Sequence, residues 1–427
     1  MINIELIRKD PAAIEAALRR RVDNVSLAEV VQLDNQRREI QTALDERRSK
    51  RNELSKQIGM LRGKGNDTTE LQATATSINS EIAELEQRMT ETQASLEEKI
   101  AQFPNVPDDR VPDGGKENNQ VVKTWGEPPK LHAQFKDHHE LSRQHELIDY
   151  ERGTKIGGSG FWIYKGQGAA LEWSLIDYFN REHVKDGYTF MLPPHLLLDF
   201  CGFAAGQFPK FREDVFHLQV TEDNRQRFLL PTAETAILSA YSEEILERET
   251  LPLKVFAYTP CYRREGGGYR TEERGTLRGH QFNKVEMFQF VEPDDAERAL
   301  AELVRKAERL VEGLGLHYRT SLLAAKDVSA SMRMTYDVEV WIPSINGYKE
   351  VSSISWAGDY QARRANIRYK PEGKKGTAFI HTLNASGLAT SRLLPAIVEQ
   401  LQREDGTITV PEPLRHWLGT DVIGKPK

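Results

Sequence analysis

Cysteine is scarce in this chain of 427 residues, which contains only Cys201 and Cys261. Two thiols can form at most one bridge, so neither a disulfide framework nor a cysteine-rich zinc site is available. We expect both to be buried free thiols. Long apolar runs are missing too, and the N-terminus lacks the apolar core of a signal peptide. The sequence therefore predicts a cytoplasmic protein without a membrane-spanning segment.

Positive charge is not in excess either. The chain has 58 Lys and Arg against 64 Asp and Glu, a formal net charge of −6. Nucleic-acid binding would therefore depend on a local basic patch rather than on the field of the whole molecule. A hydrophobic content of 39% and a charged content of 29% are typical of a globular protein. The length predicts about two or three domains.

The first hundred residues show the seven-residue repeat of a coiled coil. Asp10-Pro11 is a helix start, and positions from Leu33 to Leu61 then alternate in steps of four and three, holding apolar residues and arginines. The same rhythm runs from Ile78 to Lys99, after a turn cluster at 63–67. This pattern predicts an antiparallel helical hairpin, an arm on the order of 50 Å long at about 1.5 Å per residue.

The two predicted helices carry opposite charge. Residues 37–64 hold nine basic and four acidic side chains, whereas residues 67–99 hold eight acidic and two basic ones. Opposite signs favour pairing of the helices and leave a basic stripe on the first. Such periodicity is also typical of a dimerising or spacer coiled coil with a solvated face, so the stripe alone does not establish nucleic-acid binding.

Repeated prolines between Phe103 and Pro112 end the helical pattern. We therefore predict a helical domain over residues 1–103 and a second domain over 104–427, with a linker at about 104–120. The second domain alternates apolar runs of strand character with amphipathic helices. Strands are predicted at 161–164, 228–230, 255–258, 285–291 and 336–342, and helices at 169–184 and 296–314. Their mostly short, polar connections predict an α+β fold, an antiparallel sheet flanked by helices.

Residues 231–286 gather arginines, glycines and carboxylates of the kind that a nucleotide site needs. Arg263-Arg-Glu265 leads into a glycine-rich loop that contains Arg274, and Arg278 then precedes a strand-like segment at 280–286. An arginine on a strand can make a bidentate contact to a phosphate or carboxylate, and glycines let the backbone approach a polyphosphate closely. We expect a strand, a loop and a return strand.

Taken singly, these residues have simpler interpretations. Arg263 and Glu265 can form a surface ion pair, Glu286 can be a satisfied carboxylate, and Ser386-Gly387 can begin a helix. We interpret His280 and Cys261 as packing residues without a catalytic role.

As an ordered set, the segments resemble class II aminoacyl-tRNA synthetases in their seryl form. The resemblance covers nearly the whole chain, from Met1 to about Gly419. Its segments are motif 1, the dimer-forming segment, at 187–194, a serine-binding Thr-x-Glu loop at 232–234, motif 2 at 263–286 and motif 3 at 384–392.

The resemblance implies a homodimer with a class II catalytic domain and a tRNA-binding arm, which activates L-serine with ATP and Mg²⁺ and transfers it to tRNA(Ser). The serine site would comprise Thr232, Glu234, Arg263, Glu286, Asn384 and Ser386. The ATP site would comprise Arg263, Glu265, Arg274, Phe282, Glu350, Val351, Ser352, Ser353 and Arg392. Within these sets, Arg263 and Arg392 would be catalytic, and Glu350 and Ser353 would hold the metal. The tRNA-binding residues would be Arg37, Arg38, Arg47, Arg48, Lys50, Arg51 and Lys56.

Five positions in or next to these segments depart from the usual family pattern, namely Gly160, Ile354, Trp356, Ala385 and Ser391. A bulky Trp356 and a serine in place of the usual glycine at 391 are expected to change the shape of the pocket without removing a charge. The departures favour a second hypothesis, a specialised paralogue that resists an inhibitor or serves antibiotic biosynthesis. A third hypothesis is a non-catalytic tRNA-binding module, against which the intact set of arginines and glutamates argues.

Overall fold

The computed structural model describes residues 1–219, 223–265 and 276–424. It divides into two compact units, one formed by Ile2–Pro104 and the other by Met1 with Asn105–Lys427. No helix in the described ranges is both long enough and apolar enough to cross a membrane. Cys201 and Cys261 are both buried and free, as expected.

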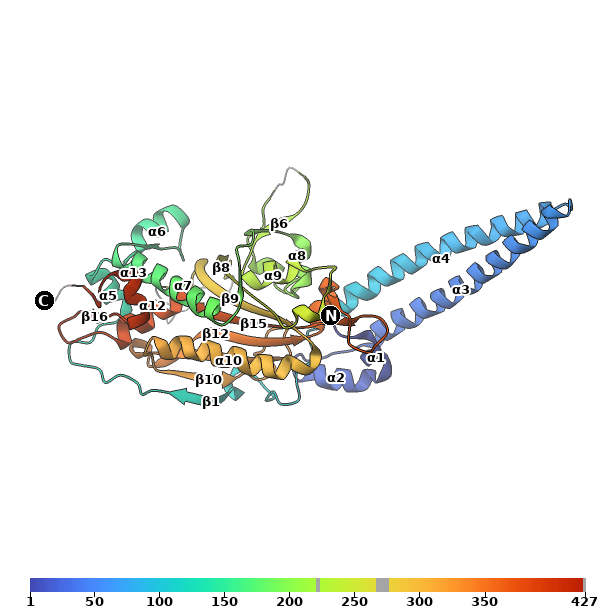
Figure 1. Ribbon diagram of the computed structural model, residues 1–427. Coiled ribbons are helices and arrows are strands. Elements are labelled where there is room, and N and C mark those ends of the chain that lie inside the picture. Colours follow the sequence, from blue (N-terminus) through green and yellow to red (C-terminus); the bar gives the residue numbers. More distant parts are fainter. Residues whose placement is uncertain (220–222, 266–275, 425–427) are drawn as a thin grey trace. The chain divides into compact units, whose positions relative to one another are not determined.

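The smaller unit consists of four helices, and its two long helices form an antiparallel hairpin (Figure 1). They are α1 (Ile4–Lys9), α2 (Pro11–Arg19), α3 (Ala28–Gly63) and α4 (Thr69–Ala101). Asp10 caps α2, because its carboxylate accepts a hydrogen bond from the Ala13 amide at 2.9 Å and Pro11 occupies the first helical position.

Apolar side chains and cross-helix ion pairs hold the hairpin together. Ile40, Leu44 and Leu54 of α3 pack with Ile78 and Ile82 of α4 in one cluster. This is the seam predicted from the heptads, so the coiled-coil arm is confirmed.

The arginines beside this seam have acidic partners. Arg47 pairs with Glu81 at 2.6 Å and Arg48 with Glu86 at 2.7 Å, which joins the two oppositely charged helices. Arg37 contacts the carboxylate of Asp34 at 3.3 Å within its own helix. Because both partners of the two cross-helix pairs are exposed, each of these pairs contributes at most about 1 kcal/mol, whereas the Asp34 carboxylate is buried.

An eight-stranded sheet forms the centre of the larger unit, and every neighbouring pair is antiparallel except the parallel pair of β4 and β8 at one edge. In sheet order, the strands are β1 (Gln120–Trp125), β10 (Tyr318–Leu322), β11 (Met334–Ile342), β12 (Gly347–Gly358), β15 (His381–Ala389), β9 (Gln281–Val291), β8 (Leu253–Tyr262) and β4 (Thr189–Met191). The predicted α+β class with an antiparallel sheet is confirmed.

Helices cover both faces of this sheet. One face packs against α7 (Gln167–Lys185), α10 (Ala296–Gly313) and α12 (Thr390–Gln400) in the main apolar core. The other face packs against α8 (Asp199–Ala204), α9 (Ala233–Ala240) and α11 (Tyr360–Ala365) in a second core at the β8 and β9 end. Successive residues of β9 divide between the two cores, because side chains alternate along a strand: Met287 points to the first and Phe288 to the second.

Short elements complete the larger unit. They are α5 (His138–Gln144), α6 (Tyr150–Gly157), α13 (Arg415–Leu418), β2 (Ile148–Asp149), β3 (Ile163–Tyr164), β5 (Leu196–Leu198), β6 (Arg227–Leu229), β7 (Ile245–Leu246), β13 (Arg368–Tyr369), β14 (Ala378–Phe379), β16 (Ile408–Thr409) and β17 (Val422–Ile423). The predicted strands at 161–164 and 228–230 correspond to β3 and β6, which lie in two-stranded sheets outside the central one.

Candidate active site

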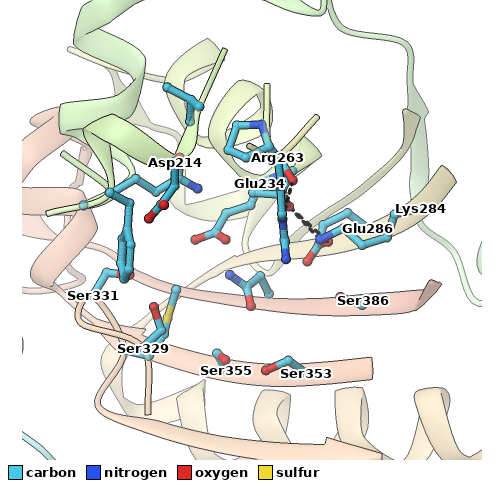
Figure 2. Close-up of a pocket in the computed structure, with 18 of the residues that line it drawn as sticks. Asp214, Glu234, Arg263, Lys284, Glu286, Ser329, Ser331, Ser353, Ser355 and Ser386 are labelled. Carbon is cyan, nitrogen blue, oxygen red and sulfur yellow. Dashed lines mark hydrogen bonds and ion pairs between the residues drawn. The ribbon is translucent and has the colours of Figure 1, made fainter. Parts of the chain in front are cut away.

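A cavity of about 460 Å³ lies on the sheet face that carries α8, α9 and α11. Figure 2 shows Glu234 and Arg263 pointing into it from one side, while serines of β12 and β15 lie on the opposite side. A smaller pocket of about 50 Å³ shares Arg263 and Ser386 with it.

Strand alternation places the polar floor of the cavity. Lys284 and Glu286 of β9 line it, whereas Val285 between them belongs to the main apolar core. The same alternation sends Asn384 and Ser386 of β15 into the cavity. Glu286 and Ser386 are also register partners on adjacent strands, so the sheet itself brings motif 2 and motif 3 together.

A bulge in β12 brings two predicted ATP residues to one side. Ser353 lines the cavity, and by simple alternation Glu350 would lie on the other face. The pairing with β11 shifts by one residue here, since Val338 pairs with Ser352 and Glu339 pairs with Glu350. The extra residue, Val351, therefore allows Glu350 to line the same cavity as Ser353.

The N-terminus of α9 supplies the other wall. Thr232 caps this helix, and Glu234 follows in its first turn, so both side chains face the cavity. Burial and then the nearby Glu286 carboxylate raise the pKa of Glu234, while Gln361, Lys284 and Asn384 act in the opposite direction, and the resulting pKa is about 7.

Lys284 is a residue that the sequence analysis did not assign. Its Nζ donates a hydrogen bond to the Thr232 hydroxyl at 2.7 Å and makes a very short ion pair with Glu286. The hydroxyl of Thr232 lies 3.3 Å from Glu286 Oε2. Lys284 is buried, and it compensates the negative charge of Glu286 inside the protein.

Arg263 lies where the two pockets meet. Its guanidinium stacks 5.2 Å from the centre of the Phe282 ring, and its Nε donates to the Pro231 carbonyl at 3.3 Å. Glu265 instead pairs with Arg278 at 2.6 Å, so the simpler interpretation of an Arg263–Glu265 ion pair is wrong.

The smaller pocket gathers most of the remaining ATP residues. Phe282, Val351 and Arg392 line it together with Glu350. Arg392 lies in the first turn of α12 and donates to the backbone carbonyls of Glu350 at 2.8 Å and Leu277 at 3.2 Å. One guanidinium nitrogen is 3.4 Å from the Glu350 carboxylate.

One described residue of the predicted ATP set lines neither pocket. Ser352 is fully buried, and its hydroxyl donates to the Ser386 carbonyl at 2.5 Å. It therefore supports the floor rather than facing the cavity. Arg274 lies outside the described residues.

Four of the five departing positions avoid both pockets, and only Ser391 lines one of them. Ile354, Trp356 and Ala385 point into the main apolar core on the opposite face of the sheet. The expectation that Trp356 shapes the pocket directly is therefore wrong. The indole instead packs under the Arg333 guanidinium at 4.4 Å. Gly160 accepts a backbone hydrogen bond from His280 at 3.1 Å.

Sequence reasoning also missed two loops and one aspartate. Gln207, Asp214, Ser329 and Ser331 line the cavity from loops distant in sequence, and no local pattern pointed to them. Asp337 is buried beside Ser353, its register partner. Burial, and then the nearby Glu350 carboxylate, raises its pKa well above its ordinary value. An acidic residue in the middle of an apolar strand was a signal that could have identified it.

Neither His280 nor Cys261 is among the described residues that line the cavity or the smaller pocket. The His280 Nδ1 lies 3.0 Å from the Arg263 carbonyl oxygen, and Cys261 belongs to an apolar cluster beneath the cavity.

Comparisons with known proteins agree with this architecture. A family model described as the class II tRNA synthetase core domain (G, H, P, S and T) matches residues 216–401, and the fold and cavity define a member of that class. A second model, the seryl-tRNA synthetase N-terminal domain, matches residues 1–107. The chain is 53% identical to serine--tRNA ligase 2 of Clostridium acetobutylicum, covering 99% of this chain and 100% of that protein.

Further relatives extend the match over whole chains. Serine--tRNA ligase of Synechococcus elongatus is 40% identical, with 100% of both chains covered. The seryl-tRNA synthetase of Pyrococcus horikoshii complexed with ATP superimposes with a TM-score of 0.91 at 30% identity, again over 100% of both chains. The chain belongs to the seryl-tRNA synthetase family.

Proposed function

We propose that this protein activates L-serine with ATP and transfers the seryl group to tRNA(Ser). The observation that carries the proposal is one cavity that holds two carboxylates, Glu234 and Glu286, next to Arg263, and that continues into a pocket lined by Phe282 and Arg392. The first part suits an amino acid, and the second suits a nucleotide.

The groups of serine match the first part of the site. The carboxylates of Glu234 and Glu286 attract its ammonium group, and Arg263 pairs with its carboxylate. Thr232, Asn384 and Ser386 provide hydrogen bonds for the hydroxyl end. A site built to hydrogen-bond a hydroxyl rejects an analogue without one by a factor on the order of 10⁴. Serine would therefore be preferred over alanine.

The nucleotide part suits ATP. Phe282 offers a ring for adenine, and Arg392 and Arg274 would hold the terminal phosphates. Glu350 and Ser353 offer the oxygen ligands that Mg²⁺ prefers, and Asp337, the register partner of Ser353, adds a buried Oδ1 atom that has no hydrogen-bond partner among the described residues. These residues fit a magnesium ion, which would neutralise phosphate charge when bound.

The reaction needs positioning more than acid–base help. A serine carboxylate oxygen attacks the α-phosphorus in line, the bond to the bridging oxygen breaks, and pyrophosphate leaves. The terminal ribose hydroxyl of tRNA then attacks the carbonyl carbon of the seryl-adenylate, and AMP leaves. Arg263 and Arg392 stabilise the negative charge that gathers at phosphorus, so they are the proposed catalytic residues.

The arm is the proposed tRNA-binding element. Of the seven predicted contact residues, Arg38, Lys50 and Lys56 are exposed and form no ion pair within the described ranges, whereas Arg37, Arg47 and Arg48 are paired. Arg51 donates to its neighbour Asn52. Phosphate contacts by such a stripe position a nucleic acid without selecting its sequence. Because charged tRNA is used on ribosomes, we place the reaction in the cytoplasm.

Serine-dependent exchange of pyrophosphate into ATP, followed by charging of purified tRNA(Ser), tests the proposal. Exchange with serine but not with alanine or threonine supports it, and its absence in folded protein contradicts it. Repeating the assay with a stable seryl-adenylate analogue tests the alternative of an inhibitor-resistant paralogue, which Ser391 in the smaller pocket favours. Exchange by itself would exclude a non-catalytic module.

A further inference from the structure

Gln361 lies behind the cavity wall and touches one of the carboxylates proposed to bind serine. It belongs to α11, is 1% exposed and does not line the cavity as described. Its Nε2 donates hydrogen bonds to Glu234 Oε1 at 2.6 Å and to the Ala205 carbonyl at 3.0 Å. Both protons of the amide nitrogen therefore have acceptors.

The orientation of this amide is fixed from the other end. The hydroxyl of Thr382, on β15, donates to Gln361 Oε1 at 2.7 Å. If the amide were reversed, its oxygen would face both the Ala205 carbonyl and the Glu234 carboxylate, which are acceptors. Three elements, α9, α11 and β15, are therefore linked through one buried side chain.

We propose that Gln361, oriented by Thr382, is a positioning residue for serine recognition, because it holds the Glu234 carboxylate in place and supplies the hydrogen bond that favours its charged form. The inference rests on the proposed function, in which Glu234 binds the serine ammonium group. Gln361 itself makes no contact with the substrate.

The surroundings of Glu234 make this hydrogen bond important. Burial and the neighbouring Glu286 both favour the neutral carboxyl, whereas Gln361, Lys284 and Asn384 favour the carboxylate, with a resulting pKa of about 7. The other charged groups of the described lining are Asp214, Arg263, Glu265, Arg278 and Glu350. At neutral pH the group is thus close to half ionised, and the loss of one donor shifts the balance toward the form that cannot pair with an ammonium ion.

Steady-state pyrophosphate exchange with Gln361→Leu tests the inference. We expect the KM for serine to rise roughly ten- to a hundredfold, the range for a lost hydrogen bond to a charged group, with the KM for ATP changed less than about threefold. The fall of kcat/KM for serine on acidification should also move to higher pH. Gln289→Leu is the matched control, because Gln289 is an equally buried glutamine that donates to Tyr188 away from both pockets.

Thr382→Val is a milder second variant, which leaves Gln361 in place but removes the group that orients it. We expect a smaller rise in the serine KM and a shift of the pH profile in the same direction, and this result counts even if Gln361→Leu does not fold. Equal rises in both KM values, or a serine KM and pH profile like those of the control, overturn the inference while the wild type remains active. A wild type without serine-dependent exchange instead overturns the proposed function and the inference with it.

Discussion

At the scale of single residues, Glu286 is the most constrained group of the site. It is 2% exposed and contacts both Lys284 and Thr232. Glu286→Gln keeps the shape but removes the charge, so we expect the serine KM to rise roughly ten- to a hundredfold with little change in that for ATP.

Separate binding measurements for serine and ATP check this prediction. The control is Glu308→Gln, since Glu308 is another buried glutamate, paired with Lys123 and hydrogen-bonded to Thr320, and lines neither the cavity nor the smaller pocket. Equal losses for serine and ATP would show that Glu286 supports the whole site rather than the serine end.

Ser391 and Trp356 are expected to act differently, although both depart from the family pattern. Ser391→Gly should keep exchange within about tenfold, or roughly 1.4 kcal/mol in barrier, and lower the inhibition constant of a seryl-adenylate mimic by about ten- to a hundredfold. Trp356→Asn should mainly lower the free energy of unfolding, by about 3–5 kcal/mol, because it empties core volume. Chemical denaturation and inhibitor titration of each variant separate the two effects, and an unchanged inhibition constant in Ser391→Gly would remove the resistance hypothesis.

At the scale of elements, Glu172 joins three of them around the nucleotide pocket. This residue of α7 accepts hydrogen bonds at Oε1 from Asn283 of β9 at 2.8 Å and Thr390 of α12 at 2.5 Å. Asn283 and Thr390 directly adjoin Phe282 and Ser391, which line that pocket. Glu172 therefore connects both walls of the pocket from behind.

The titration of Glu172 gives a pH prediction. Burial raises its pKa to about 7, while Thr390, Asn283 and Tyr164 act in the opposite direction. The folded state thus keeps a proton that the unfolded chain releases near pH 4.5. This contribution to stability is complete below that value and is lost as pH rises to about 7. We expect the free energy of unfolding of the wild type to fall relative to that of Glu172→Gln between pH 5 and 8, as measured by denaturant titration. If the free energies of both proteins changed with pH in parallel, the raised pKa of Glu172 would be contradicted.

The arm gives a prediction about salt. Lys50 and Lys56 are exposed on α3, so the double change to alanine should weaken tRNA binding and reduce the slope of log affinity against log salt by about 0.9 for each lost phosphate contact. Arg88→Ala, an exposed basic position on α4, is the control.

Deleting residues 33–100 should abolish charging but leave pyrophosphate exchange largely intact. Loss of exchange in a folded deletion variant would assign the arm a further role.

The sequence was most informative where a repeat or a motif is local. The heptads predicted the hairpin because its two helices are adjacent in the chain, and motif 2 predicted the pair of β8 and β9 for the same reason. By contrast, the segments that form β12 and β15 were identified by their site residues, but they were not predicted to be strands. The loop contributions of Gln207 and Ser331 depend on the folded topology, and so did not appear in any local pattern.

At the scale of the whole molecule, exposed apolar side chains gather on and around α7 and β4. Trp173, Val184, Phe190 and Leu192 are 44%, 57%, 43% and 73% exposed. The homodimer that the family resemblance implies would cover them. Leu192→Glu should therefore yield monomers in light scattering, whereas Ile156→Glu, at a position 77% exposed on α6, should not. A dimeric Leu192→Glu protein would place the interface elsewhere.

The extra residue at Val351 also sets a limit on how this chain can change length. Because the pairing of β11 and β12 shifts there, one insertion or deletion near the bulge exchanges the faces of every side chain on one side of it. Glu350 would turn toward the core, while Ser353 and Ser355 would keep their places. Point substitutions can change the pocket in small steps, but the insertion or deletion of one residue in this strand cannot. Chain length within β12 should therefore be among the least variable features of functional descendants of this sequence.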